Sequence, residues 1–426
     1  MYQMKQVKFI FLTCFLCVFW VIPLWADKTL SWEDCVKEAY LNNPELISAA
    51  QELKQTEADK GIVQSAALPQ ITTELNGRKY EAAASNKQRD SYSYGVSGRQ
   101  LLFDGFKTSN DIAAAKEGIK ASQYNYAVVS SNVRLNLRAS FSELLRAQAL
   151  IPLTEDIAQR RKENLELVQL RYDAGREHRG ALLTAQADFS QAEFEVEQAK
   201  RNLSLAQAKL IKELGWQEKV PIVVEGEFAV SDSESLKPDF IDLADNTPFL
   251  RELAARKEVA RFGLKSAKAD FFPQIYLTSS IGKTDSYWAP DDKEWAAGLS
   301  LSFPIFEGGI RIAKVSKEEA RVEQAQADER SGRDTVIVTL EEAWKDLQDA
   351  VDQVLVQGKF LRASQERAKI ANAQYSTGLI NFDDWIIIEN ELVIAKKAYL
   401  NTQTNMLVAE ARWIQAKGGV LEYAEK

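Results

Sequence analysis

The chain has 426 residues, of which 46% are hydrophobic and 27% are charged, and its formal net charge is −8. This length exceeds one ordinary domain, and the composition is that of a folded rather than a disordered protein. The acidic balance argues against nucleic acid as a partner, because nucleic-acid binding needs a basic surface.

The first 26 residues have the pattern of a secretory signal peptide. Lys5 and Lys8 precede an apolar run over residues 9–22, and a cleavage position follows Ala26. An uncleaved anchor is the weaker alternative, because the run is shorter than the ~20 residues that a spanning helix needs. Cys14 lies within the run, so a lipid-modified N-terminus stays open as a second alternative.

The exported chain would keep only one cysteine, Cys35, and so could form no internal disulfide. Beyond residue 26 no apolar run approaches the ~18 residues of a transmembrane helix. If the mature chain crosses a membrane, it must therefore do so with β-strands.

An internal repeat organises the mature chain, because landmarks recur at an offset of 203 or 204 residues. They are residues 43–44 with 247–248, residues 68–71 with 272–275, and residues 171–175 with 374–378. We therefore expect two copies of one unit, at 27–216 and 247–419. A connector at 217–246 and a tail at 420–426 complete the chain, and the connector is expected to contain short strands that pair locally.

Both copies show the same succession of periodicities. In the first copy they predict a helix at 44–67, strands at 70–80 and 91–103, a long helix at 105–172 and a return helix at 180–215. In the second copy they predict a helix at 248–271, strands at 274–284 and 294–306, a long helix at 308–375 and a return helix at 382–417. The first helix of each copy is expected to stop before a proline, Pro69 or Pro273.

The predicted strands alternate apolar with small or polar residues over about ten positions. This pattern is typical of outer-membrane barrel strands, and aromatic residues near the strand ends fit the same interpretation: Tyr80, Tyr92, Trp288 and Trp295. A soluble, half-buried hairpin would show the same alternation, so the strands alone leave both readings open.

The helices favour the elongated reading. A single helix over residues 105–172 would reach ~100 Å, which does not fit a compact globule. Each return helix carries an unbroken heptad seam, from Leu182 to Leu210 and from Trp385 to Trp413. Pro152 is expected to kink or break the first long helix, at the level where the connector wraps around it.

Each second strand ends at an abrupt motif: Phe103, Asp104 and Gly105 in the first copy, and Phe306, Glu307 and Gly308 in the second. After each motif the periodicity changes from that of a strand to that of a helix. We expect both motifs to be strand-to-helix junctions at the membrane interface.

The order, duplication and constant offset of these features resemble the outer-membrane efflux proteins, the TolC family. The resemblance implies a mainly α fold with a β-barrel portion. Long antiparallel coiled-coil helices would form a periplasmic α-barrel, and four strands per chain would contribute to a twelve-stranded barrel in a homotrimer. An open four-stranded sheet supports an oligomer independently, since lipid cannot satisfy its two edges.

The resemblance also implies a function: a passive exit duct in the outer membrane of a Gram-negative bacterium, extending into the periplasm and surrounded by outer-membrane lipid. Its partners would be a periplasmic adaptor and an inner-membrane pump of RND, ABC or MFS type. No enzyme activity and no cofactor are expected, because the sequence contains one histidine and no recognisable catalytic motif. Alternatives are a type I secretion component and, less favoured, a periplasmic coiled-coil adaptor or scaffold.

The resemblance places the adaptor contacts at the two helical turns, which carry Tyr172, Gly175, Tyr375 and Gly378. It also places an acidic entrance at Asp384, to which Asp383 would contribute because the second acidic position is Ile387 here. The other entrance candidates are Arg176, His178 and Arg179. We hypothesise that Asp384 faces Arg176 or Arg179 of a neighbouring helix pair in the closed state; the alternative is that these are solvated loop charges.

Overall fold

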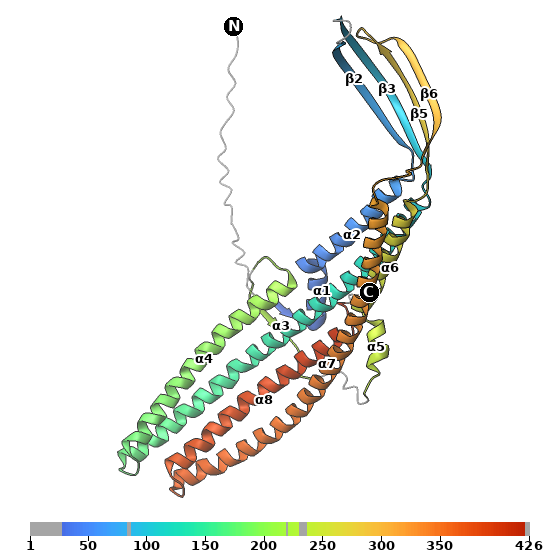
Figure 1. Cartoon of the computed structure of the whole chain (residues 1–426). Helices are drawn as coiled ribbons and strands as arrows, with labels where there is room; N and C mark the ends of the chain where they lie inside the picture. The colour runs from blue at the N-terminus through green and yellow to red at the C-terminus, as the bar shows by residue number, and fades with distance from the viewer. Residues whose placement is uncertain (1–27, 83–86, 219, 230–236, 422–426) are drawn as a thin grey trace, which may run out of the picture.

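The computed structural model of the protein describes residues 28–82, 87–218, 220–229 and 237–421. The predicted signal peptide and most of the predicted tail lie outside these residues. The molecule is elongated, with a small sheet at one end and two long helical hairpins at the other (Figure 1). Short elements cluster around the middle of the helices, near the two ends of the described chain.

The sheet has four antiparallel strands in the order β2-β3-β5-β6. Their bounds are Gln70–Ala82, Lys87–Phe103, Gln274–Asp285 and Asp292–Ser302. The two hairpins of the repeat share one register, because Ile71 pairs with Gly98 and Ile275 pairs with Leu301. Strands β2 and β6 are the edges, and within the part of the chain that the structure describes neither pairs with another strand on its outer side.

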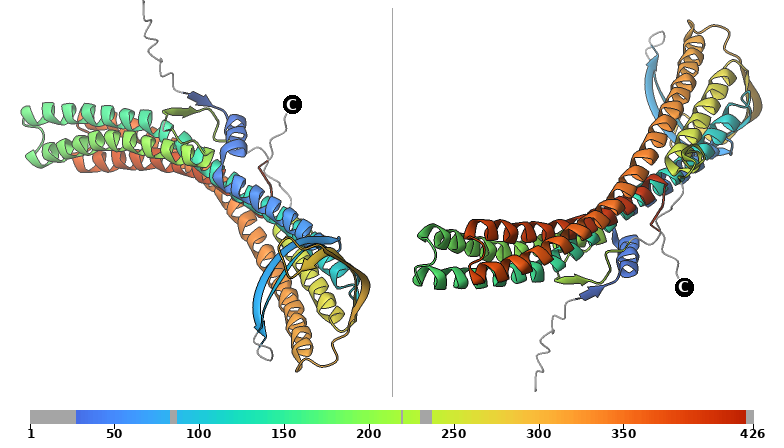
Figure 2. Two further views of the ribbon diagram at one scale, coloured as in Figure 1. Left: turned by 90° about the horizontal axis from the view of Figure 1, so that it is seen from above. Right: turned by 90° about the horizontal axis from the view of Figure 1, so that it is seen from below.

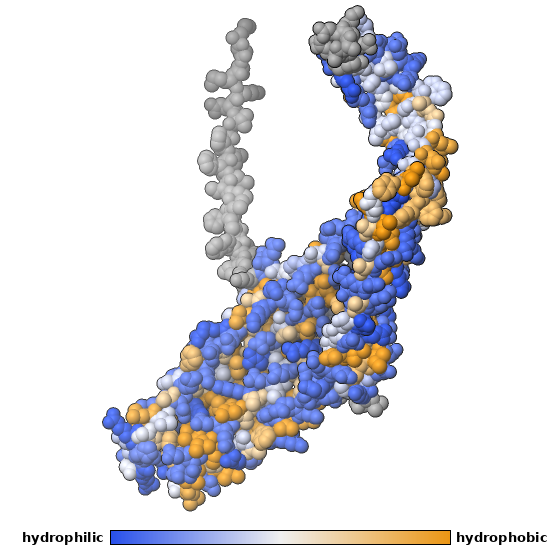
Figure 3. Space-filling view, in the orientation of Figure 1, coloured by the Kyte–Doolittle hydropathy of each residue, from blue (hydrophilic) through white to orange (hydrophobic). Residues whose placement is uncertain are grey.

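The register gives the sheet one apolar and one polar face. Cross-strand pairs on the apolar face include Leu277 with Leu299 and Ile281 with Trp295, and Trp295 is 76% exposed. The opposite face is lined by small and polar residues: Thr72, Ser97, Ser280 and Ala296. Apolar residues also gather where the sheet meets the helices (Figure 3). The side chain of Tyr80, one of the aromatic residues of the sequence pattern, lies outside the described part.

The last strand is shorter than the sequence pattern indicates. The sequence predicts a strand at 294–306, whereas β6 begins at Asp292 and ends at Ser302. The prediction that the strand reaches Phe306 is therefore wrong. Pro304 explains the early end, because proline has no N–H to donate to a β-ladder. Strand β3, by contrast, continues to Phe103 across a register shift between Leu101 and Phe103.

The helices form one layer that continues the sheet (Figure 2). Next to the sheet, α2 (Pro44–Ser65), α3 (Lys107–Asp173), α6 (Pro248–Ala269) and α7 (Ile310–Thr377) contact one another in that order, which is also the order of the strands. Toward the far end, α4 (Arg179–Leu214) takes the place of α2, and α8 (Phe382–Ala416) takes the place of α6. The chain therefore provides four helical columns.

Helix α3 continues through Pro152 without interruption, so of the predicted kink or break the break is wrong, and the kink stays a prediction. The proline removes one backbone hydrogen bond, to the carbonyl of Gln148, at a cost of about 3 kcal/mol in a helix interior. Side chains on both sides of it are buried against other helices, including Leu144 and Ile157. This packing holds the helix together across the lost bond, as part of a bundle that curves along its length (Figure 2).

A waist of short elements surrounds the middle of the helices: β1 (Lys28–Leu30), α1 (Trp32–Asn42), β4 (Ile222–Val224) and α5 (Phe240–Asn246). The connector does not pair locally as predicted, because β4 pairs in parallel with β1 at the start of the described chain. The side chain of Gln148 donates to the carbonyl of Val224 at 3.0 Å and accepts from its N–H at 2.9 Å. The connector thus contacts α3 one turn before Pro152.

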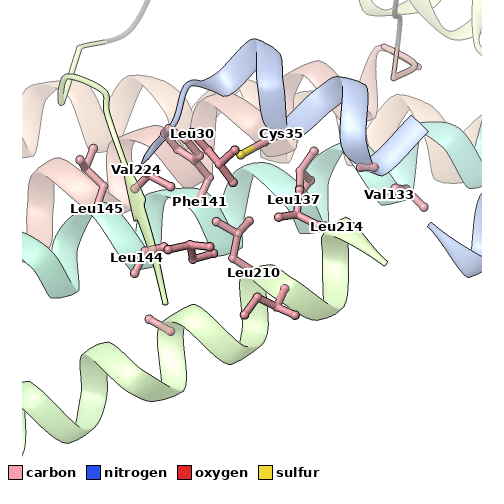
Figure 4. Close-up of a cluster of buried hydrophobic side chains, with 14 of the residues drawn as sticks. Leu30, Cys35, Val133, Leu137, Phe141, Leu144, Leu145, Leu210, Leu214 and Val224 are labelled. Atoms are coloured by element: carbon pink, nitrogen blue, oxygen red, sulfur yellow. The ribbon is translucent and has the colours of Figure 1, made fainter. Parts of the chain in front are cut away.

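The waist contains a hydrophobic cluster that includes Leu137, Phe141, Leu210 and the fully buried Cys35 (Figure 4). Cys35 forms no disulfide with any residue that the structure describes. Within the described residues, no helix has a stretch that is both long and apolar enough to span a bilayer.

Candidate functional site

The far end of the helical layer is formed by two turns of the same construction, which we call the tip. In the α3–α4 turn, the N–H of Arg176 donates to the carbonyl of Arg171 at 2.8 Å; in the α7–α8 turn, Leu379 donates to Gln374 at 2.8 Å. Gly175 and Gly378 take positive φ values of 67° and 82°, which glycine adopts without strain. The two Tyr-x-x-Gly motifs therefore end the long helices in the same way.

Each return helix begins with a side-chain cap. The ring nitrogen Nδ1 of His178 accepts from the N–H of Ala181 at 3.0 Å, and the side chain of Asn381 accepts from the N–H of Asp384 at 2.8 Å. These bonds satisfy backbone donors that have no partner within the helix. His178, an entrance candidate in the sequence, thus has a capping role in the structure.

A buried aromatic and ionic cluster joins the two turns. Tyr375 is fully buried and stacks on Trp385, with ring centroids 4.1 Å apart and planes 8° from parallel. Its hydroxyl donates to Glu177 at 2.9 Å, and Arg171 donates to its backbone carbonyl at 2.7 Å. Burial, and then the bond to Glu177, raise the pKa of the Tyr375 phenol far above its ordinary value. Tyr375 therefore contacts both hairpins.

The other predicted site residues are exposed around this cluster. Asp383, Asp384, Arg176 and Arg179 are all exposed, and Tyr172 is half-buried against the aromatic cluster. Among the ion pairs of the described residues, none joins Asp384 to Arg176 or Arg179 within the chain. At the first turn, Arg171 instead forms an ion pair with Glu177 at 3.7 Å, and Nε2 of the capping His178 lies 3.9 Å from the same carboxylate.

Further from the tip, the buried carboxylate of Glu389 on α8 forms hydrogen bonds with side chains of α3. Glu389 is 1% exposed and accepts from Arg160 at 2.6 and 2.7 Å and from Asn164 at 3.2 Å. The adjacent Arg161 donates to Asn390 and lies 3.7 Å from Asp188 of α4. The hydrogen bond to Glu389 raises the pKa of the Arg160 guanidinium, so it stays protonated. One pair of arginines thus contacts both return helices.

Sequence reasoning missed both clusters. One signal was available for Glu389, because it stands, with Asn390 and Glu391, inside the otherwise apolar run "WIIIENELVIA" (385–395) beside the heptad seam. A charged residue there needs a partner once it is buried. No comparable signal pointed to Glu177, since its partner Tyr375 lies on the other hairpin, 198 residues away.

The two strand-to-helix junctions differ in how they are covered. At the first, Asp104 is 8% exposed and accepts from the N–H of Thr108 at 2.7 Å, while Lys107 forms an ion pair with Asp270 at 2.5 Å. At the second, Glu307 accepts from Arg311 at 2.8 Å, but Phe306 is 86% exposed. The first junction is therefore packed within the chain and the second is open.

No group of three or more metal-ligating side chains is placed to hold an ion within the described ranges. The clusters at the tip and along α3 and α8 consist of caps, stacked rings and ion pairs between helices. Contacts of this kind hold neighbouring helices together while they are formed, and the helices can separate when they break.

The fold, with its amphipathic sheet continued by four helical columns, is that of an outer-membrane channel subunit. The sequence profile of the outer membrane efflux protein family matches residues 35–216 and 242–419, so the chain belongs to this family. The resemblance and the fold class predicted from the sequence are thereby confirmed. The protein is an outer-membrane efflux channel of the kind found in Gram-negative bacteria, and its family consists of channel proteins rather than enzymes.

Three relatives illustrate the match. The outer membrane efflux protein BepC of Brucella suis is 23% identical over 386 residues, which cover 89% of this chain and 84% of BepC. The alkaline protease secretion protein AprF of Pseudomonas aeruginosa is 23% identical over 310 residues, covering 67% of this chain and 63% of AprF. A crystal structure of CusC has a TM-score of 0.82 at 20% identity, covering 90% of this chain and 91% of CusC.

Proposed function

We propose that three copies of the chain close into one duct, which takes cargo from a periplasmic adaptor and an inner-membrane pump and conducts it out of the cell. The observation that carries the proposal is the open sheet. Among the described residues, no strand pairs with the outer side of either edge strand, β2 or β6, and the apolar face is exposed, with Trp295 76% and Leu299 71% accessible. In lipid every backbone group needs a partner, so the edges must be closed by further copies.

Three copies would give a twelve-stranded barrel, with the apolar face toward lipid and the small and polar residues toward the lumen. Twelve strands lie between barrels of ~8 strands, which side chains fill, and porins of ~16, which hold water. A duct of this kind needs no catalytic group of its own. The energy for transport would come from the pump, of RND, ABC or MFS type.

The test of the duct is reconstitution of the purified protein in planar bilayers, with the oligomeric state measured by light scattering. We expect a trimer that forms discrete conducting channels. A monomer that stays in the soluble fraction and forms no channels would favour the coiled-coil adaptor or scaffold instead.

At the tip, we propose that Asp384, with Asp383 beside it, lines the entrance and that three copies concentrate negative charge there. Rings of acidic side chains favour cations. Since Asp384 makes no ion pair with another residue of the described ranges, its proposed partner, Arg176 or Arg179, would belong to the neighbouring copy. Single-channel recordings of Asp384→Ala and Arg179→Ala test this: we expect raised conductance in both and a weaker cation preference in Asp384→Ala. Unchanged conductance and selectivity in both would exclude the gate.

The adaptor would bind at the exposed surface of the two turns, next to Tyr172, Gly175, Tyr375 and Gly378. Both glycines have open space around them, with no atom within 4 Å of the position that a Cβ would take. Photo-crosslinkers at the exposed neighbours Arg176 and Leu379 should capture an adaptor in intact cells. Crosslinkers at the waist should not.

The relationship to AprF, a secretion protein by name, favours a secreted polypeptide as a second candidate cargo. Export of a reporter polypeptide through the reconstituted system, measured beside efflux of small molecules, distinguishes the two kinds of cargo.

A further inference from the structure

A cavity of about 230 Å³ lies in the middle of the helical layer, where the end of α8 meets the start of α6. Four helices form its walls, and its apolar lining comes from Val128 of α3, Pro248 and Phe249 of α6, Val336 of α7 and Ala416 of α8. Sites for drug-sized ligands measure ~300–1,000 Å³, so an occupant of this cavity would be a smaller organic molecule.

Polar side chains that line the cavity form hydrogen bonds within its walls. The side-chain amide of Gln415 donates to Asn132 at 3.0 Å, and the hydroxyl of Ser131 donates to the carbonyl of Gln415 at 3.3 Å. The hydroxyls of Thr335 and Thr339 donate to carbonyls of their own helix at 2.8 and 2.9 Å. Each of these side chains is therefore held in its wall, and the space between the walls stays open.

In the first repeat, a carboxamide side chain closes the equivalent joint between α4 and α2. Asn43 is 2% exposed and is the N-cap of α2, where its Oδ1 accepts from the N–H of Glu45 at 2.9 Å and of Leu46 at 3.2 Å. Its Nδ2 donates to the carbonyl of Glu213, near the end of α4, at 2.8 Å. One primary carboxamide therefore fastens the start of α2 to the end of α4.

The second repeat keeps the backbone of this joint but not its carboxamide. Thr247, the equivalent of Asn43, has φ −69° and ψ 142°, close to the −66° and 122° of Asn43. Its hydroxyl donates to the carbonyl of Ala244 at 2.8 Å, and no side chain of the described residues caps the first N–H groups of α6. Ala416, the equivalent of Glu213, lines the cavity. The second joint therefore has a cavity beside it instead of a capping amide.

We propose that this cavity binds a small molecule that carries a primary carboxamide on a compact apolar body. The carboxamide accepts from the first N–H groups of α6 and donates to a carbonyl at the end of α8, as Asn43 does in the first repeat. The apolar body lies against Val128 and Val336. An occupied site fastens α8 to α6 and so restrains the second hairpin, which carries Asp384. The site goes beyond the proposed duct and does not depend on how copies of the chain assemble.

The probe is benzamide, and the readout is hydrogen–deuterium exchange of the intact, detergent-solubilised protein. Without the probe, the amides of Phe249 and Leu250 should exchange faster than those of Glu45 and Leu46, which are bonded to the side chain of Asn43. Millimolar benzamide should slow exchange at the start of α6 several-fold and leave the start of α2 unchanged. Acetophenone keeps the ring and the carbonyl but cannot donate, so it should slow exchange less. Equal protection of the two helix starts without the probe, or equal slowing of both by it, would overturn the site.

Thr247→Asn supplies the carboxamide from the chain itself. It should slow exchange at the start of α6 without benzamide and abolish the further effect of the probe. Asn43→Thr is the matched control, and it should speed exchange at the start of α2 while leaving the response of α6 to benzamide intact. If Thr247→Asn does not fold, Ala416→Leu, which fills the cavity from α8, should abolish the response instead. A response to benzamide that persists in the folded variant contradicts the proposal. Because exchange needs no conducting channel, failure of the duct in bilayers leaves this test unaffected.

Discussion

The pair between Arg160 and Glu389 gives a direct measure of how strongly the two hairpins are joined. Glu389 is 1% exposed and accepts three hydrogen bonds, two from Arg160 and one from Asn164, which is itself 5% exposed. Glu389→Ala would leave a partly buried cation and a buried amide without their acceptor. Losing one partner of a buried ion pair costs about 3–5 kcal/mol. Because the Arg160 side chain keeps 29% exposure and can turn toward water, we expect a loss near the lower end of that range.

The assay is denaturant unfolding of the detergent-solubilised protein, arranged as a double-mutant cycle with Arg160→Met and Glu389→Leu. The apolar double variant should be close to wild type in stability, because buried ion pairs often contribute little net free energy. Glu197→Ala is the control, since Glu197 forms an exposed pair with Lys200 and should change nothing measurable. A Glu389→Ala variant no less stable than this control would show that the buried pair does not hold the hairpins together.

Four further predictions concern the tip, the first junction and the waist. Tyr375→Phe removes one hydrogen bond to Glu177 and should cost about 1 kcal/mol, detected as faster proteolysis at the α7–α8 turn. Because the folded-state pKa of Tyr375 is raised, its contribution is complete below pH ~10 and is lost as the pH rises further, so wild type should lose more stability in alkali than Tyr375→Phe. Gly105→Ala should cost more than ~1 kcal/mol and lower the yield of folded protein, because φ is 69° and the new Cβ would lie 2.5 Å from Phe272. Cys35 is 0% exposed and should react with a maleimide only after denaturation.

The architecture could be predicted from the sequence because it is repetitive. Strand alternation, long uninterrupted helical stretches and heptad seams are local patterns. Each of them occurs twice in the sequence, at an offset of 203 or 204 residues. The register of the two hairpins could not be read in this way, yet it follows the repeat: Ile71 with Gly98, and Ile275 with Leu301.

The errors arose where tertiary contacts decide the local structure. Pro152 was expected to kink or break α3, and α3 is not broken there, because the packing on both sides of it outweighs one lost hydrogen bond. The connector was expected to pair locally, but β4 finds its partner in β1. The contacts of Tyr375 with Glu177 and of Arg160 with Glu389 join residues about two hundred positions apart, and no local pattern encodes them.

The pairing of β1 with β4 sets an order of events during export. Leu30 lies at the start of the described chain, and its partner Val224 lies beyond the whole first repeat. If the N-terminus enters the periplasm first, β1 must wait for nearly half of the chain to follow before its ladder can form. Contacts this distant in sequence form slowly, because the intervening loop must close first. We therefore expect the β1–β4 ladder to form late in folding, only after the first repeat has been delivered in full.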